Sequence, residues 1–124
     1  EFAARGGTYS RGYRFSGSND ADKVAWYRNV RPNPHPVKGK NPNELGIHDM
    51  SGNVYEWCSD WYSDYSAGIQ TNPKGPADGL GRVIRGGCWL SESSSSCRVT
   101  GRLYIDPNYS NFDIGFRLAT TVQR

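Results

Sequence analysis

Glycine and proline recur so often along this chain that few stretches between them can hold a long regular element. The 124 residues include 15 glycines and 7 prolines, and only 35% of the residues are hydrophobic. Prolines 32, 34, 36 and 42 fall in one stretch, which we expect to be an extended surface connection, because proline lacks the backbone N–H of regular structure. The pattern favours a loop-rich domain with short elements over a helical bundle.

Two short stretches in the middle of the chain show strand patterns. Residues 54–61 alternate apolar and polar side chains after a turn at residues 51–53. Residues 82–87, RVIRGG, form a second short strand that ends on paired glycines, which permit positive φ or close packing. Asp20 or Asp22 can cap one short helical turn near the start of the chain.

A third alternating segment, IGFRLATT, lies at the end of the chain. Its residues Ile114, Phe116 and Leu118 share one side, so we expect a half-buried strand. Long helices are absent from the pattern, and the expected fold class is α+β with short strands and long loops.

Composition and charge limit the classes of fold and partner. Aromatic residues make up 13% of the chain, which indicates a folded domain. The net charge of +3 is scattered, so we expect no nucleic-acid partner. No apolar run approaches the roughly 20 residues of a transmembrane segment. The chain begins without Met and resembles the interior of a larger protein, so its start carries no information about a leader.

The usual catalytic patterns are missing. His35 and His48 do not fall in a spacing known for metal or triad chemistry. Asp60 and Asp64 lie where a polar segment leaves a strand, so we interpret them as solvated side chains. The three cysteines allow at most one disulfide and leave one thiol over.

Several blocks of residues carry a resemblance to a known family. They are EFAARGG, NELGIHDMSGNVYEWCSDWY, GPADGLGRVIRGGCW and IGFRLA, in this order. The blocks resemble the sulfatase-modifying-factor family, whose founding members are formylglycine-generating enzymes. The resemblance implies a C-type-lectin-like, formylglycine-generating-enzyme-like fold with short antiparallel strands and few helices. Because the family domain extends farther upstream, we expect residues 1–124 to be the C-terminal part of a single domain.

Tryptophans and arginines in these blocks fit a scaffold role. Trp57, Trp61 and Trp89 are expected to supply buried area to a chain that has few aliphatic residues. Four arginines recur near glycines and aromatic residues, where they are expected to pin loop carbonyls and carboxylates: Arg85, Arg98, Arg102 and Arg117.

The resemblance also predicts that catalysis is lost. The enzymes of the family oxidise a substrate cysteine with copper held by two cysteines, and a pair of soft thiolates suits Cu(I). The comparable positions here are near Ser91 and Ser96, and serine does not replace a thiolate. Cys97 lies one place beyond the second position and has no partner five residues before it. We therefore expect no copper and no enzymatic activity.

The segment DMSGNVYE resembles one that binds Ca²⁺ in the enzymes. The resemblance implies that Asp49 and Glu56 bind the ion by side chain, and Gly52 and Val54 by carbonyl oxygen. In the alternative, Asp49 and Glu56 brace the turn and pair with arginines. In many noncatalytic relatives Cys58 and a cysteine at the position of Cys97 occur together, as a disulfide or as small apolar groups.

Between the family's fixed residues, the segment 85–119 carries an irregular set of side chains. Related proteins have repeated Asn at many such places, and nearly all residue types here can be reached from an Asn codon by changing adenines, with Glu92 as an exception. This is the pattern left by a diversity-generating retroelement, whose variable proteins use this fold. The predicted variable, ligand-binding residues are Leu90, Ser91, Ser93, Ser94, Thr100, Gly101, Leu103, Tyr104, Ile105, Asp106, Asn108, Tyr109, Ser110, Asn111, Phe112 and Asp113.

The composition of this segment independently indicates a binding surface. Tyr with Ser, Gly and Asn is typical of antibody loops. In the alternative, Leu103, Ile105 and Phe112 fill the core beneath the loops. We expect a protein or glycan ligand and, by analogy with related variable proteins, a cell-surface or secreted location. The alternative function is a formylglycine-generating-enzyme-like oxidase, or its accessory subunit, that acts on protein cysteine.

Overall fold

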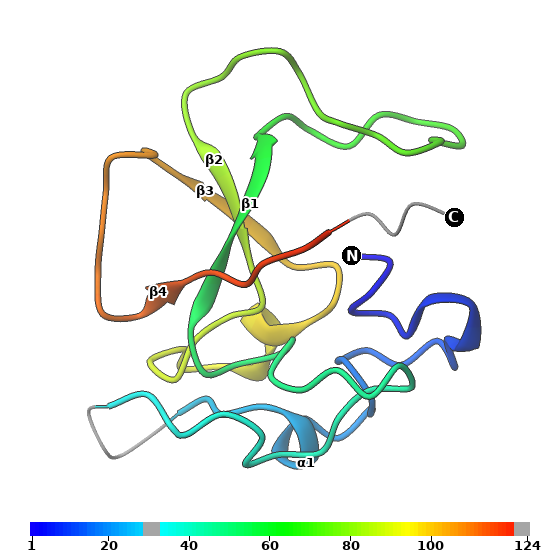
Figure 1. The fold of residues 1–124 in the computed structure, drawn as a ribbon, viewed down its shortest axis with the longest axis vertical. Coiled ribbons are helices and arrows are strands. Elements are labelled where there is room, and N and C mark those ends of the chain that lie inside the picture. Colours follow the sequence, from blue (N-terminus) through cyan, green and yellow to red (C-terminus); the bar gives the residue numbers. More distant parts are fainter. Residues whose placement is uncertain (29–32, 121–124) are drawn as a thin grey trace.

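Four short strands form one sheet at the centre of the structure (Figure 1), a computed structural model that describes residues 1–28 and 33–120. The strands are β1 (Tyr55–Trp61), β2 (Arg82–Arg85), β3 (Arg102–Ile105) and β4 (Ile114–Gly115). They lie in the order β3-β2-β1-β4, and β4 runs parallel to β1 whereas the other neighbours are antiparallel. The β1–β2 and β3–β4 connections extend away from the sheet, at the top and the left of Figure 1.

The two strands predicted in the middle of the chain are confirmed as β1 and β2. Trp57 pairs with Ile84, and the register then shifts, so that Trp61 pairs with Arg82. The Arg82 guanidinium carbon lies 3.9 Å from the centre of the Trp61 ring. Trp57 and Trp61 are only half-buried, whereas Trp89 is buried as expected.

The predicted turn before β1 is also confirmed. Gly52 has a φ of 76°, and a Cβ at this position would lie 2.5 Å from the backbone N and O of Trp26, so only glycine fits. The buried Asn53 has a φ of 68°. Its side chain forms two hydrogen bonds with the main chain of His35. Asn53 Oδ1 accepts one from the His35 N–H at 2.8 Å, and Asn53 Nδ2 donates one to the His35 carbonyl at 3.1 Å. These contacts fix where β1 begins.

Helical structure is short. The helix α1 (Ala21–Val24) is capped by Asp20, whose side chain accepts a hydrogen bond from the Asp22 N–H at 3.1 Å, as predicted. There are also two short 3-10 helices: η1 (Gly7–Tyr9), which precedes α1, and η2 (Ser94–Cys97), which lies between β2 and β3. No helix among residues 1–28 and 33–120 is long and apolar enough to cross a membrane.

The main hydrophobic cluster lies between α1 and η2. Its buried members are Phe15, Ala21, Val24, Ala25 and Cys97, with the partly buried Tyr27 packed against them. The paired glycines after β2 bring η2 close, since a Cβ on Gly87 would lie 2.7 Å from Cys97 Sγ. Gly87 also has a φ of 72°, so both readings of the paired glycines hold here.

The expectation of a half-buried strand over 114–121 is wrong beyond its first two residues. Phe116 and Leu118 are 73% and 90% exposed. The strand ends at Gly115, and the Arg117 guanidinium beyond it binds Glu56 of β1 and the carbonyls of His48 and Asp49. The residues beyond 120 lie outside the described part of the chain.

The proline-rich connection agrees with its prediction, whereas the strand β3 was not predicted. The proline-rich connection has no helix or strand over residues 33–42, and its portion at 29–32, with Pro32, lies outside the described residues. The strand β3 was not expected, since three apolar residues in a row, 103–105, hide the alternation. It is an edge strand with no fully buried residue.

Candidate ligand-binding surface

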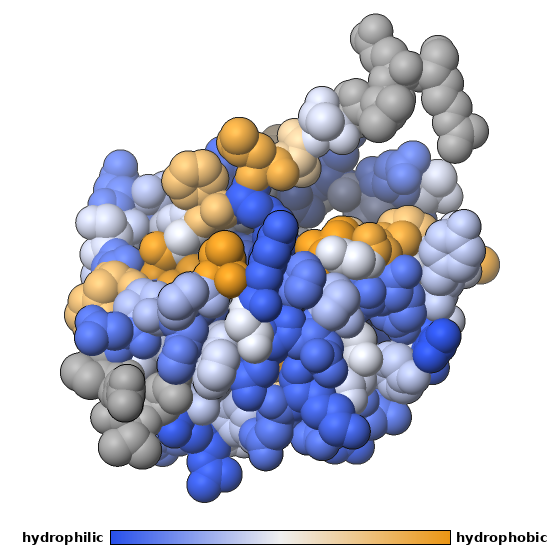
Figure 2. Space-filling model, turned by 60° about the horizontal axis from the view of Figure 1, so that its bottom comes forward, coloured by the Kyte–Doolittle hydropathy of each residue, from blue (hydrophilic) through white to orange (hydrophobic). Residues whose placement is uncertain are grey.

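The large side chains of the predicted binding segment face solvent. Leu90, Leu103, Tyr104, Tyr109 and Phe112 are 46%, 53%, 53%, 48% and 66% exposed, respectively. The alternative in which Leu103 and Phe112 fill the core is therefore wrong, whereas Ile105 is half-buried. Figure 2 shows apolar side chains gathered in a band across one face of the molecule.

The strand β3 divides the predicted residues between two faces of the sheet. Successive side chains of a strand point to opposite faces, so Tyr104 faces away from Leu103 and Ile105. The ring of Tyr104 lies on that of Tyr62, with the ring centres 4.6 Å apart. Tyr62 directly follows β1 and stands outside the predicted segment. The predicted residues therefore do not form one continuous surface.

The β3–β4 loop supports itself with its own polar groups. Asp106 Oδ1 accepts a hydrogen bond from the Asn108 N–H at 2.8 Å, and its carbonyl accepts one from the Tyr109 N–H at 2.9 Å. Asn111 Oδ1 accepts from the Phe112 N–H at 2.9 Å. Asp106 and Asn111 thus shape the loop, while the side chains of Asn108, Tyr109 and Ser110 remain exposed.

Three other predicted residues have structural roles. Ser93 caps η2 through a 3.2 Å hydrogen bond from the Ser95 N–H to its hydroxyl. A Cβ on Gly101 would lie 3.2 Å from two carbonyl oxygens, so a larger residue crowds this turn. Asp113 is half-buried, and its carbonyl accepts a 2.8 Å hydrogen bond from the Tyr55 N–H. Of the remaining predicted residues, Thr100 is exposed and Ser94 is half-buried.

Ser91 and Ser96 converge on the hydroxyl of Tyr55. Both serine side chains act to lower the pKa of Tyr55, but burial is the largest effect and raises it. Cys88 Sγ lies 3.7 Å from Ser91 Oγ and 3.8 Å from a carboxylate oxygen of Asp113. The two positions at which the resemblance places copper thiolates therefore carry neutral hydroxyls around a neutral ring.

All three cysteines are free thiols, so the disulfide between Cys58 and Cys97 is not formed and the packing alternative describes them. Cys97 is completely buried, and burial raises the pKa of its thiol to about 12. Burial also raises the pKa of Cys58 and of Cys88. A thiolate is the form that binds metal or attacks a substrate, so none of the three is activated.

The predicted calcium residues lie around a cavity of about 350 Å³. Asp49, Val54 and Glu56 line it, whereas Gly52 does not. One oxygen of Asp49 accepts a 2.7 Å hydrogen bond from the Lys38 N–H, and the other is buried without a hydrogen-bond partner. The free Asp49 oxygen is the one feature here that suits a cation.

Arg117 already supplies a cation to this place. Its Nε and Nη2 bind the two oxygens of Glu56 at 2.6 and 2.5 Å, and Nη2 also binds the Asp49 carbonyl at 3.0 Å. Within residues 1–28 and 33–120 no three His, Cys, Asp or Glu side chains are grouped to hold a metal ion. As the side chains lie, they do not fit calcium, and the bracing alternative describes Glu56. The calcium site stays a prediction.

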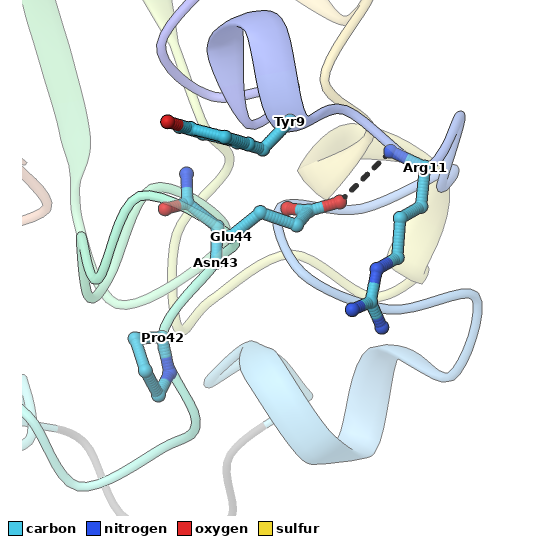
Figure 3. Close-up of a pocket in the computed structure, with 5 residues that line it drawn as sticks. All are labelled: Tyr9, Arg11, Pro42, Asn43 and Glu44. Atoms are coloured by element: carbon cyan, nitrogen blue, oxygen red, sulfur yellow. Dashed lines mark hydrogen bonds between the residues drawn. The ribbon is translucent and has the colours of Figure 1, made fainter.

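A hollow of about 430 Å³ lies away from the predicted residues (Figure 3). The ring of Tyr9 lies over Glu44, and Glu44 Oε1 accepts a 3.1 Å hydrogen bond from the Arg11 N–H. The other Glu44 oxygen is buried without a hydrogen-bond partner. These contacts join the N-terminal segment to the loop that precedes β1.

A larger cavity of about 690 Å³ lies under the β1–β2 loop. Arg85 and Arg102 line it from the sheet and Tyr65 from the loop. The Arg102 guanidinium carbon lies 3.6 Å from the centre of the Tyr65 ring and 4.7 Å from that of Tyr62. Neither tyrosine was predicted as a site residue, although the aromatic residues among 61–65, at the end of a strand, could have indicated them.

Comparisons with known proteins agree with the resemblance. The family model described as "Sulfatase-modifying factor enzyme 1-like domain" matches residues 1–122. The formylglycine-generating enzyme of Streptomyces coelicolor is 36% identical over 137 aligned residues, which cover 96% of this chain and 43% of that enzyme. The serine/threonine-protein kinase Pkn1 of Chlamydia trachomatis is 38% identical over 127 residues, 99% of this chain and 20% of that protein.

Among solved structures, Treponema denticola variable protein 1 is 42% identical with a TM-score of 0.82, over 92% of this chain and 42% of that protein. The fold is therefore C-type-lectin-like and resembles that of a variable protein of a diversity-generating retroelement, as expected. The chain spans less than half the length of each of these three relatives.

Proposed function

The chain belongs to the family of sulfatase-modifying factor enzyme 1-like domains, and we propose that it is a non-enzymatic member that binds a ligand through a diversified surface. In this proposal the scaffold holds the loops of residues 90–113, whose exposed side chains are exchanged by a diversity-generating retroelement. The likeness to a Treponema variable protein, at 42% identity, supports this assignment.

The proposal rests chiefly on the β3–β4 loop, which combines a hydrogen-bonded backbone with exposed side chains. Asp106 and Asn111 hold its backbone, so the loop keeps its shape while Tyr109 and Phe112 face solvent at 48% and 66%. A rigid amphipathic ring that is held in the open gives contact area at low entropic cost. Such a loop tolerates exchange of its outward side chains, which is what diversification requires.

The cluster around Tyr55 supports the absence of catalysis. Ser91 and Ser96 offer hydroxyls where the enzymes of the family hold copper, and hydroxyls are poor ligands for Cu(I). The neighbouring thiol of Cys88 has a pKa that burial raises, so it stays protonated. The residues therefore do not fit a copper ion, and no step of the proposed function passes through one.

The ligand in this proposal is a protein or a glycan, and the location is the cell surface or the outside of the cell. Rings of Tyr and Phe among Ser and Asn can meet either ligand class, because the rings supply area and the small polar groups supply direction. Nucleic acid is not expected, since the chain carries a net charge of only +3.

The genome around the coding sequence tests the proposal. A retroelement requires a reverse transcriptase gene nearby and a second copy of the segment that encodes residues 85–119. We expect the two copies to differ only where the template has adenine. Differences at other bases, or a locus without the second copy, would contradict diversification by a retroelement.

The alternative is an oxidase, or accessory subunit, that acts on protein cysteine. It is favoured by the 36% identity to a formylglycine-generating enzyme. The full protein, loaded with Cu(I), would be incubated with a cysteine-containing peptide and oxygen. We expect no loss of the peptide thiol above a copper-only control, whereas catalytic turnover would establish the alternative.

A further inference from the structure

Arg85 and Arg102 face each other directly across the β2–β3 pair. Two like charges at directly opposite positions of an antiparallel pair are destabilising unless something neutralises them. The two guanidinium groups line one wall of the 690 Å³ cavity under the β1–β2 loop. This wall of the cavity therefore holds two positive charges side by side on a rigid element.

Only one of these two arginines is neutralised. Arg85 Nη2 lies 3.1 Å from Glu1 Oε2 and donates to the Tyr65 hydroxyl at 3.3 Å. Arg102 forms no ion pair with any residue in 1–28 or 33–120; it is stacked on Tyr65 and Tyr62 instead. Stacking uses the face of a guanidinium and leaves the N–H groups at its edge for an acceptor.

Glu1 shows which chemistry the cavity accepts. Its carboxylate is shared between Arg5, at 2.8 Å, and Arg85, at 3.1 Å, and it accepts a 3.1 Å hydrogen bond from the Tyr65 hydroxyl. Glu1 and Phe2 both line the cavity, so a peptide segment already lies along its wall. The ring of Tyr65 thus separates a bound carboxylate, on Arg85, from the vacant edge of Arg102.

We propose that this cavity binds a peptide segment that presents one carboxylate side chain to Arg102. The tyrosines hold the guanidinium in place, so a bidentate pair can form with little loss of side-chain freedom. Tyr104, which lies on Tyr62, borders this site from β3. The site faces away from Leu103 and Ile105, and its two arginines are not among the predicted exchangeable residues, so it goes beyond the proposed function.

Two aspartates limit what the cavity accepts. Asp60 and Asp64 line it as well, and neither lies within ion-pair distance of Arg102. Lys74 lines the cavity with the opposite charge, so the aspartates weaken the attraction for carboxylates without abolishing it. The Glu1–Phe2 pair is the model for the peptide that we propose, a single carboxylate beside an apolar residue.

The probes are the blocked peptides Gly-Glu-Phe-Gly and Gly-Gln-Phe-Gly, titrated into the full-length protein that contains these 124 residues and followed by ¹H–¹⁵N NMR. We expect the Glu peptide to bind about tenfold more tightly than the Gln peptide, as one charge-assisted pair allows. Its shift changes should centre on Tyr65, Arg102 and Tyr104. Equal binding of the two peptides, or shifts elsewhere, would overturn the proposal without use of any variant.

Variants then isolate the arginine. Arg102→Gln should reduce binding of the Glu peptide to the level of the Gln peptide. Arg82→Gln is the matched control, because Arg82 is also stacked on a ring, that of Trp61, but does not line the cavity, so binding should be unchanged. Asp64→Asn should tighten binding by removing a negative charge. Unchanged binding of the Glu peptide to Arg102→Gln, or a loss of binding by Arg82→Gln as large as that by Arg102→Gln, would contradict the site.

Glucuronic acid distinguishes the two sources of a carboxylate. We expect it to bind at least about fivefold more weakly than the Glu peptide, since it lacks the apolar neighbour and backbone groups. Tighter binding of the sugar acid would overturn the assignment to a peptide. These results depend on Arg102, which is not among the predicted exchangeable residues, whereas the proposed function is tested by sequence variation, so failure here and failure of the proposed function are distinct.

Discussion

Arg117 and Glu56, 61 positions apart in the chain, form a two-point ion pair through Nε and Nη2 at 2.6 and 2.5 Å. The pair joins the segment after β4 to β1, at the β1 residue that pairs with Gly115. The same guanidinium binds the carbonyls of His48 and Asp49, so one side chain fastens three segments.

Replacement of Glu56 by Gln should therefore lower the free energy of unfolding. We expect a loss of about 1 kcal/mol, a small value because Arg117 is 37% exposed and water screens the pair. Urea denaturation measures it. Glu92→Gln is the matched control, since Glu92 is exposed and should be indifferent to the change. Equal stability of Glu56→Gln and the wild type would show that the pair does not brace the loop.

Calcium should not stabilise the protein. An ion that binds only the folded state raises the unfolding midpoint, and Glu56 is not free to bind one here. Thermal unfolding in about 5 mM Ca²⁺ and in EGTA should give the same midpoint. A higher midpoint in calcium that Asp49→Asn removes would instead establish the predicted site.

The buried thiol of Cys97 should make the protein sensitive to alkali. Its pKa is raised from 9.0 to about 12 in the folded state, so the unfolded chain loses this proton first. The stabilising contribution is complete below pH 9 and is lost as the pH rises from 9 towards 12. We expect the unfolding free energy of Cys97→Ala to fall less steeply over this range than that of the wild type. Parallel pH profiles would mean that Cys97 is accessible to water.

Truncation of Trp89 should lower the free energy of unfolding far more than truncation of the loop side chains. Trp89 is 2% exposed, so Trp89→Ala should cost about 3–5 kcal/mol. Tyr109→Ala and Ser110→Ala should each change stability by less than about 0.5 kcal/mol, because these side chains face solvent. Denaturant midpoints compare the three variants. Strong destabilisation by the loop variants would place the ring of Tyr109 in the core.

Gly101 tests which positions of the predicted segment can vary. A Cβ there would lie 3.2 Å from two carbonyl oxygens, so Gly101→Asn should destabilise the protein, whereas Asn108→Ser should not. Thermal midpoints of the two variants provide the comparison. A tolerated Asn at 101 would return this residue to the set of exchangeable positions.

Local chemistry decides the elements of this fold that could be predicted from the sequence. The Asp20 cap, the turn at Gly52 and Asn53, and β1 each follow from residues close together in the chain. The length of β4 did not follow, because Arg117 leaves the sheet for two carbonyls that are almost 70 residues away. No local alternation contains that information.

The exposed side chains of the candidate surface were predicted from local composition, but their division between two faces was not. The exposed rings of Tyr109 and Phe112 follow from a loop composition that resembles antibody loops. The division by β3 did not follow, since its consecutive apolar residues conceal which side chains share a face. The contact of Tyr104 with Tyr62 depends on strand register, which only the folded structure supplies.

Deep sequencing of the segment encoding residues 85–119, from many cells of one population, tests the central claim most directly. We predict that substitutions concentrate at exposed positions such as Leu103, Tyr109 and Phe112, while the buried Trp89 and Cys97 stay fixed. The substitutions should trace to adenines of a template copy. A uniform sequence in every cell, or changes spread evenly over buried and exposed positions, would contradict the account.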